Sequence, residues 1–263
     1  RPQKGRYRQF YQIGAELLGP SDHAGLDAEV IEMLLAFFER IHLKGATLYI
    51  NSIGDKNCRP AYIEILREEL RKVKDRLGPD SQRRIETNPL RVLDSKLTEE
   101  QQVIAGLPRI ADNLCISCKS HYAQLKQELA LRNITYEENW RLVRGLDYYM
   151  RTTFEITATG LGSQDAVCGG GRYDGLVEML GGPPTKGIGF AIGTDRLILS
   201  LEQATALEQA KSLEQAGAAK SSGASGAAKP ASEIDVYLAW LGATAYPAAV
   251  ALARKLRQQG IAV

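Results

Sequence analysis

Five residues near the start of the chain place a cation, an aromatic ring, an amide and a carboxylate at every second position. They are Arg8, Phe10, Gln12, Gly14 and Glu16. In a strand, residues two apart share a face, so these side chains would lie together, with a gap at the glycine. The opposite face is mostly apolar and suits a core. The polar face is therefore either the floor of a ligand site or a solvated sheet face, and both interpretations stay open at this point.

Two glycine-rich segments later in the chain indicate a close approach to the backbone. Residues 168–171 (Cys-Gly-Gly-Gly) precede Arg172, Tyr173 and Asp174, and residues 187–193 carry glycine at 187, 189 and 193. One face of that second strand is almost bare, so a packed ring or a ligand must lie against it. A helix then begins at residue 194 and places Arg196 in its first turn. The helix dipole disfavours a cation there, which favours a functional role for Arg196.

Cysteine and histidine spacing raises the question of a metal site. Cys115, Cys118 and His121 have the i, i+3, i+6 spacing of one helix face. Structural zinc normally takes four ligands from two clusters, but no second pair follows and Cys168 is remote in sequence. We therefore expect a packing face and no protein-bound structural metal. The chain has four cysteines, too few for a disulfide framework, and this favours a reducing, cytoplasmic setting.

Hydrophobic periodicity and turn residues predict the elements that position these groups. Strands are expected over residues 8–18, 46–50, 151–159, 187–193 and 234–240, and helices over 27–43, 60–77, 172–180 and 247–259. Further helices make residues 55–133 a mainly helical insertion between β-rich flanks. Its outer face mixes basic and acidic residues, which fits either a solvated, ion-paired helix or a contact to an RNA backbone. Residues 217–232 have the composition of a flexible linker.

Four blocks of sequence occur in order along the chain. They are residues 1–16, residues 142–149 (Leu-Val-Arg-Gly-Leu-Asp-Tyr-Tyr), residues 169–174 (Gly-Gly-Gly-Arg-Tyr-Asp) and residues 187–196. Together they resemble the histidyl-tRNA synthetases, a family of class II aminoacyl-tRNA synthetases. The first and last blocks are similar to the second and third class II motifs, and the block at 142–149 is similar to a signature of the histidine enzymes. One glycine-rich block alone would be weak support.

This resemblance implies an α+β fold, in which a mixed, largely antiparallel sheet of the class II synthetase type is flanked by helices. It divides the chain into a catalytic core (1–54 and 134–202), a helical insertion (55–133), a linker (203–232) and the start of a C-terminal α/β anticodon-binding domain (233–263). The insertion would touch the tRNA acceptor arm. In the family, the part before Arg1 holds the first class II motif, which builds the dimer interface. We therefore interpret the chain as an incomplete portion of such an enzyme.

The implied reaction is the ATP-dependent activation of L-histidine to histidyl-adenylate, followed by transfer to tRNA(His). By resemblance, Arg144 would stabilise the charge that develops at the α-phosphate, and Arg6 and Arg196 would hold the β- and γ-phosphates. Guanidinium groups suit phosphate oxygens because they donate two parallel hydrogen bonds. Phe10 would stack on adenine, and Arg8 belongs to the same ATP-binding set. Mg²⁺ is expected with ATP.

Histidine recognition would use a second group of residues. By resemblance, Glu16 and Tyr149 would bind the imidazole nitrogens, Gln12 and Tyr173 would hold the amino end, and Tyr148 lies in the same signature. A site that pairs polar N–H groups rejects ligands that lack them by roughly 10⁴-fold or more. Taken alone, Tyr148 and Tyr149 would be interpreted as core aromatics.

Composition limits the function classes. Lysine plus arginine is 33 and aspartate plus glutamate is 31, a net charge of +2, so a strongly polyanion-binding chain is excluded, though not a local basic patch. No run approaches 18 apolar residues, so no membrane partner is expected. The full-length protein is expected to be a cytoplasmic homodimer, and this portion alone to be weakly active or inactive. The alternatives are a synthetase-like regulatory subunit of histidine biosynthesis, which binds histidine without aminoacylation, and a pure RNA-binding protein.

Overall fold

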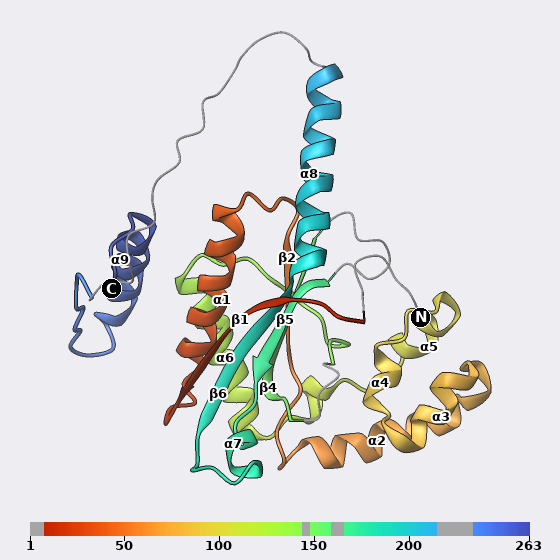
Figure 1. Ribbon diagram of the computed structural model, residues 1–263. Helices are drawn as coiled ribbons and strands as arrows, with labels where there is room; N and C mark the ends of the chain where they lie inside the picture. Colours follow the sequence, from red (N-terminus) through yellow and green to blue (C-terminus); the bar gives the residue numbers. More distant parts are fainter. Residues whose placement is uncertain (1–7, 144–147, 159–165, 215–233) are drawn as a thin grey trace.

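A six-stranded sheet forms the centre of the computed structural model, which describes residues 8–143, 148–158, 166–214 and 234–263 (Figure 1). The strand order is β1-β6-β5-β4-β2-β3. The strands are β1 (Gln12–Gly19), β2 (Thr47–Ser52), β3 (Glu137–Glu138), β4 (Met150–Thr157), β5 (Ala166–Arg172) and β6 (Lys186–Gly193). Every neighbouring pair is antiparallel except β2 and β3, which are parallel. The predicted α+β fold with a mixed, largely antiparallel sheet is thus confirmed.

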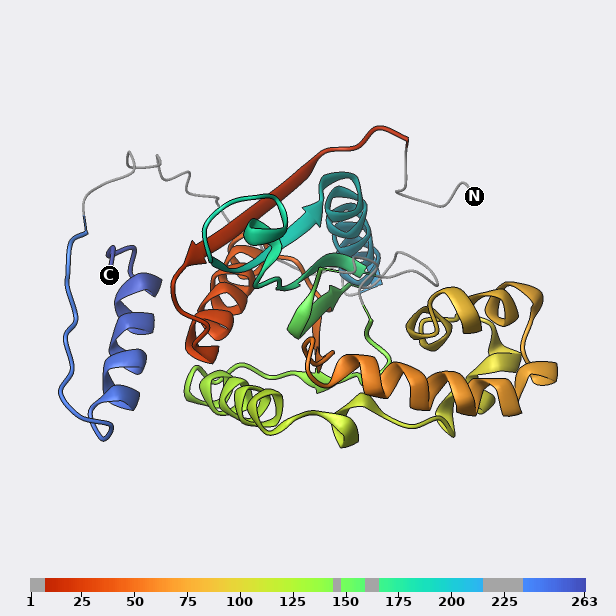
Figure 2. The same cartoon turned by 90° about the horizontal axis from the view of Figure 1, so that it is seen from below.

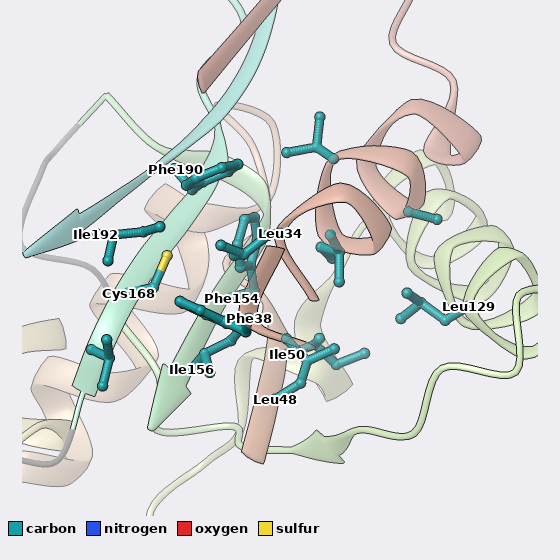
Figure 3. Packing of buried hydrophobic residues seen from close by; sticks show 14 of the residues in the cluster. Leu34, Phe38, Leu48, Ile50, Leu129, Phe154, Ile156, Cys168, Phe190 and Ile192 are labelled. Atoms are coloured by element: carbon teal, nitrogen blue, oxygen red, sulfur yellow. The ribbon is translucent and has the colours of Figure 1, made fainter. Parts of the chain in front are cut away.

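Two helices, α1 (Ala24–Arg40) and α6 (Ile116–Leu131), pack against one face of this sheet (Figures 1 and 2). The core between them and the strands includes Leu34 of α1, Leu129 of α6, Phe154 of β4 and Phe190 of β6 (Figure 3). The alternation of each strand sends these residues to the covered face and leaves the other face for polar groups and glycines. Helix α1 begins three residues before the predicted start, where Nδ1 of His23 accepts a hydrogen bond from the Gly25 N–H at 3.0 Å.

The segment between β2 and α6 extends to one side of the sheet (Figure 2). Its elements are α2 (Arg59–Lys72), η1 (Lys74–Arg76), α3 (Pro79–Thr87), α4 (Leu90–Leu93), α5 (Thr98–Ala105) and η2 (Ile110–Asn113). It has its own hydrophobic core, which includes Tyr62, Leu66 and Ile104. Residues 116–131, grouped with the insertion in the predicted division, instead contribute Leu125 and Leu129 to the core of the sheet. The division into domains remains a prediction.

The remaining helices are α7 (Leu176–Met179), α8 (Thr194–Glu214) and α9 (Tyr246–Gln258). Helix α9 lies beside α1 and α6, where Oη of Tyr246 donates a hydrogen bond to Glu128 at 3.0 Å and Arg257 pairs with Glu29 at 2.8 Å (Figure 2). The prediction of a strand over residues 234–240 is wrong, because the structure assigns no strand to these residues. Among the residues that the structure describes, two backbone hydrogen bonds join this segment to another, from residues 235 and 236 to the carbonyl of residue 262, which is too few for a ladder. Within the described ranges, no helix has the length and apolar character that a membrane span requires.

Candidate active site

The polar face predicted for the first strand continues onto its neighbour. In the antiparallel pair of β1 and β6, Glu16 lies opposite Gly189 and Gly14 lies opposite Ala191. On the next strand, β5, Gly171 lies opposite Gly189. Opposed residues point to the same side of a sheet, so Glu16 stands at the edge of a floor that has few side chains. This floor lies on the face away from α1 and α6.

Three tyrosines gather over this floor beside Glu16. Tyr148 and Tyr149 directly precede β4, and Tyr173 directly follows β5. The ring centroids lie 5.1 Å apart for Tyr148 and Tyr149, 6.0 Å for Tyr148 and Tyr173, and 6.4 Å for Tyr149 and Tyr173. The Tyr173 hydroxyl donates a hydrogen bond to the Glu16 carboxylate. Four of the five residues predicted to hold histidine therefore form one cluster, the tyrosine cluster (Glu16, Tyr148, Tyr149 and Tyr173).

The bare strand face is required by these side chains. A Cβ on Gly189 would lie 1.9 Å from Oε2 of Glu16 and 2.6 Å from the backbone oxygen of Ala15. A Cβ on Gly187 would lie 2.4 Å from Cε2 of Tyr173. Real Cβ contacts are much longer, so neither position accepts a larger residue without movement. The sequence left open whether a packed ring or a ligand lies against this face. In the structure, the ring of Tyr173 and the carboxylate of Glu16 lie there.

Polarity at this site suits recognition of a small ring with N–H groups. Burial, and then the hydrogen bond to Glu16, raise the pKa of Tyr173, so its hydroxyl stays protonated and acts as a donor. Glu16 is solvent-exposed, so a ligand can reach its carboxylate. An ionised carboxylate has acceptor sites for several donors. The cluster can thus offer an acidic acceptor, phenol groups and aromatic faces to one bound molecule.

Gln12 and Arg196 lie near Gly193, at the end of β6 away from Tyr173. Gln12 is opposite Gly193, four residues or about 13 Å along β6 from Gly189. Arg196 lies in the first turn of α8, as predicted, with only 7% of its surface exposed. Its Nε–H donates to the carbonyl of Ala166 at 2.6 Å, which fixes the plane of the guanidinium. Neither residue belongs to the tyrosine cluster.

Phe10 and Arg8 do not lie in the strand that the alternation predicted. Strand β1 begins at Gln12 because its partner, Gly193, is the last residue of β6 before the chain turns into α8. The carbonyl of Tyr11 instead accepts hydrogen bonds from the backbone and side chain of Thr194. Phe10 is 56% exposed and Arg8 is also exposed. Arg6 and Arg144 lie outside the described residues.

A buried ion pair between Arg172 and Asp27 supports the tyrosine cluster from the helix-covered face of the sheet, and no sequence pattern indicated this pair. Nε of Arg172 donates to Asp27 at 3.3 Å, its Nη1 donates to Asp174 at 2.9 Å, and Asp27 also accepts from Thr152 at 2.5 Å. Asp174 in turn accepts a hydrogen bond from the Gly187 N–H at 3.1 Å. Burial alone would lower the pKa of Arg172, but the hydrogen bonds and negative charges of Asp27 and Asp174 together outweigh burial and raise that pKa. This network fixes the backbone on both sides of Tyr173.

No second pair of ligands follows Cys115 and Cys118 in the sequence, but the fold brings an earlier pair to them. The turn after β2 brings Asp55 and Cys58 to them, so that one oxygen and three sulfurs lie within 4.8 Å of one another. Sequence spacing could not reveal this contact, because about sixty residues of insertion separate the two pairs. His121, the third residue of the predicted helix face, lies instead against Asp27, at 3.5 Å.

Comparison with known proteins gives a consistent result. A sequence model of the family described as histidyl-tRNA synthetase matches residues 1–197. A histidine--tRNA ligase of Koribacter versatilis is 52% identical over the whole of this chain and 56% of its own length. One of Solibacter usitatus is 47% identical over the whole chain and 58% of its own length. The chain therefore spans little more than half of the curated relatives that it matches.

One of the solved structures that the chain resembles has a similar overall fold. The apo histidyl-tRNA synthetase of S. aureus superposes on 97% of this chain and 58% of its own chain, with a TM-score of 0.60 and 35% sequence identity.

Proposed function

The chain belongs to the histidyl-tRNA synthetase family, and from this premise we propose that it is a portion of an enzyme that activates L-histidine with ATP and charges tRNA(His). One observation supports this proposal most strongly. Glu16, Tyr148, Tyr149 and Tyr173 come from three separate segments and converge over a glycine floor. Tyr149 is also a buried member of the hydrophobic core of the insertion, and Tyr148 and Tyr173 pack against that core, which holds the three rings in place beside Glu16.

For histidine, we assign Glu16 and Tyr149 to the imidazole nitrogens, with Tyr148 beside them, and Gln12 and Tyr173 to the amino end. Glu16 already accepts a hydrogen bond from Tyr173, which orients its carboxylate before a ligand arrives. The carboxylate can still accept one more from an imidazole N–H. A ligand without that N–H leaves the acceptor unpaired, so the site selects imidazole over apolar rings.

For ATP, we assign Arg144 to the α-phosphate, Arg6 and Arg196 to the β- and γ-phosphates, Phe10 to the adenine and Arg8 to the same set. Mg²⁺ would accompany the triphosphate. The reaction needs positioning and charge stabilisation more than covalent help from the protein. Arg196 suits this work because the hydrogen bond to Ala166 orders its guanidinium before ATP binds.

The tRNA would meet the insertion through its acceptor arm, and the segment from residue 233 onward would begin the anticodon-binding domain. Surface cations of α2 and α3 already pair with acids, as in Arg71 with Glu86 at 2.6 Å and Arg84 with Asp80 at 2.7 Å. Exposed pairs of this kind contribute little, so RNA phosphates can replace the acids. We place the full-length protein in the cytoplasm as a homodimer.

Calorimetry with a non-hydrolysable histidyl-adenylate analogue tests the site. Glu16→Ala removes a hydrogen bond to a charged group, which is worth about 1.5–3 kcal/mol, so the affinity should fall roughly 10- to 150-fold. Arg144→Ala should weaken binding similarly. Glu68→Ala and Arg76→Ala remove exposed charges of the insertion and are the matched controls. Unchanged affinity in Glu16→Ala would refute the assignment of that residue.

Histidine-dependent ATP–pyrophosphate exchange by the full-length parent protein tests the reaction. A synthetase exchanges pyrophosphate only when histidine is present. A regulatory paralogue would bind histidine and show no exchange, and a pure RNA-binding protein would not respond to histidine at all. This portion of the enzyme alone should charge tRNA weakly or not at all, and charging near the full-length rate would contradict this.

A further inference from the structure

Four side chains with metal-binding chemistry meet where the insertion joins the sheet. Asp55 and Cys58 lie in the turn from β2 to α2, and Cys115 and Cys118 lie at the start of α6. Their ligand atoms all lie within 4.8 Å of one another. We call these four residues the cysteine cluster. We propose that the cysteine cluster is a structural Zn²⁺ site that ties the two ends of the insertion together.

The donor set and its shape favour zinc. Zinc takes four ligands in a tetrahedron, with sulfurs at about 2.3 Å, so ligand atoms around it lie roughly 3.5–3.8 Å apart. The Asp55 carboxylate oxygen already lies 3.5 Å from the Cys58 sulfur and 3.9 Å from the Cys115 sulfur. Small side-chain movements therefore suffice to close the tetrahedron. Three thiolates and one carboxylate match zinc better than magnesium or calcium, which prefer all-oxygen sites.

Each pair of ligands is presented by a short turn with two residues between them. In the first turn, Oδ1 of Asp55 accepts a hydrogen bond from the Asn57 N–H at 2.9 Å, and the Asp55 N–H donates to the Cys58 sulfur at 3.4 Å. These bonds aim both ligand atoms at the same point. The second pair lies at the start of α6, where Cys115 is the residue before the helix and Cys118 is in its first turn, so one helix end presents both sulfurs.

Burial favours a cation among these ligands, because a carboxylate and thiolates would carry negative charge away from water. Asp55, Cys58 and Cys118 are buried, with 3%, 6% and 0% of their surfaces exposed. A carboxylate in such a place needs a charged or hydrogen-bonded partner. Arg151 supplies positive charge beside the cluster, since it donates to Ser117 at 3.0 Å and interacts with Cys118. A cation at the centre would neutralise the remaining negative charge. Four protein ligands in a closed site are typical of structural rather than catalytic zinc.

The position of the cluster explains what the metal would stabilise. The part of the insertion that lies between the two ligand pairs, residues 59–114, begins next to Cys58 and ends next to Cys115. The same junction contacts the candidate active site, because Nη1 of Arg59 donates to the Tyr149 carbonyl at 2.6 Å. A bond between the two turns closes the loop of the insertion and restricts its unfolded state. Zinc would thus hold both the insertion and the segment that carries Tyr149. This inference does not depend on the proposed function.

The test is metal analysis of the full 263-residue chain, purified under reducing conditions and loaded with Zn²⁺ or Co²⁺. We expect about one ion per chain and, with Co²⁺, the visible and charge-transfer bands of a tetrahedral thiolate site. Cys58→Ser and Cys115→Ser should each lose stoichiometric metal. Cys168→Ala changes a buried cysteine of the sheet core and is the matched control, which should keep the metal.

Two further variants separate metal binding from folding. Asp55→Asn keeps the shape of the side chain and should weaken zinc binding at least roughly tenfold with unchanged circular dichroism. Asp55→Cys completes four thiolates and should tighten binding, a gain that misfolding cannot produce. Hydrogen exchange over residues 53–118 should rise when a chelator strips the parent chain. A parent chain that takes up no stoichiometric metal, or a disulfide between Cys58 and Cys115 in the reduced preparation, would overturn the proposal.

Discussion

Replacing Asp27 by Asn tests the buried ion pair that supports the tyrosine cluster. Asp27 is completely buried, and its carboxylate accepts hydrogen bonds from Arg172 and Thr152. Asparagine keeps one acceptor oxygen but turns an amide N–H₂ toward the guanidinium, and it removes the charge. Arg172, 1% exposed, would then keep only Asp174 as an acidic partner among the described residues.

The expected loss is large because one member of a buried pair stays behind. Breaking such a pair typically costs about 3–5 kcal/mol, which lowers the folding equilibrium constant by roughly two to four orders of magnitude. Asp80 provides the control for an exposed ion pair, because its pairs with Arg83 and Arg84 are solvent-exposed. Asp80→Asn should therefore cost less than about 1 kcal/mol.

Native-state hydrogen exchange of α1 and β5 peptides measures both variants without assuming a single global transition. Asp27→Asn should lower the opening free energy of these two elements together, since the pair joins them. Asp80→Asn should leave them unchanged. If Asp27→Asn folds fully and lowers the opening free energy of α1 and β5 by less than about 1 kcal/mol, then Arg172 has another partner and the ion pair does not stabilise the tyrosine cluster.

Three further changes test the site and its surroundings. Gly189→Ala should displace the Glu16 carboxylate and weaken binding of the histidyl-adenylate analogue by about tenfold or more. Gly19→Ala is the control, because its added Cβ meets no atom within 4 Å and should leave the affinity unchanged. Equal affinities of the two variants for the analogue would contradict the role of the bare strand face. Tyr173→Phe should keep the fold but lose the hydrogen bond to Glu16, which lowers affinity roughly fivefold for about 1 kcal/mol, and calorimetry checks this. Burial lowers the pKa of His121 below its ordinary 6.5, so near pH 6.5 the unfolded chain takes up a proton that the folded chain does not, and the free energy of unfolding should fall as the pH drops through 6.5. In denaturation experiments, His121→Gln should show a smaller change of this free energy with pH. The same pH dependence in both proteins would refute the role of His121.

Local pattern was sufficient for much of the fold and for part of the site. Alternation gave the face of β1 that holds Gln12 and Glu16, and the glycines at 187 and 189 indicated that something large lies on β6. The helix start predicted at residue 194, directly after the glycine-rich strand, placed Arg196 in the first turn of α8. These features depend on residues within a few positions of one another, so their geometry follows from backbone sterics and burial alone.

Predictions failed where a partner distant in sequence decides the outcome. The strand expected over 234–240 has too few partners for a ladder, and β1 begins at Gln12 because β6 ends at Gly193. A strand exists only where another backbone satisfies its N–H and C=O groups, and the sequence of one strand does not say where that backbone is.

The sequence by itself thus determined the face, the glycines and the types of side chain that could bind a ligand. Only the tertiary structure decided which of them meet: Tyr173 with Glu16, Arg172 with Asp27, and Cys58 with Cys115. Each of these contacts joins segments separated by between 57 and 157 residues, and each is set by how the sheet, α1 and the insertion pack. Spacing along the chain carries no record of such contacts, because the energy that selects them comes from burial of the whole core.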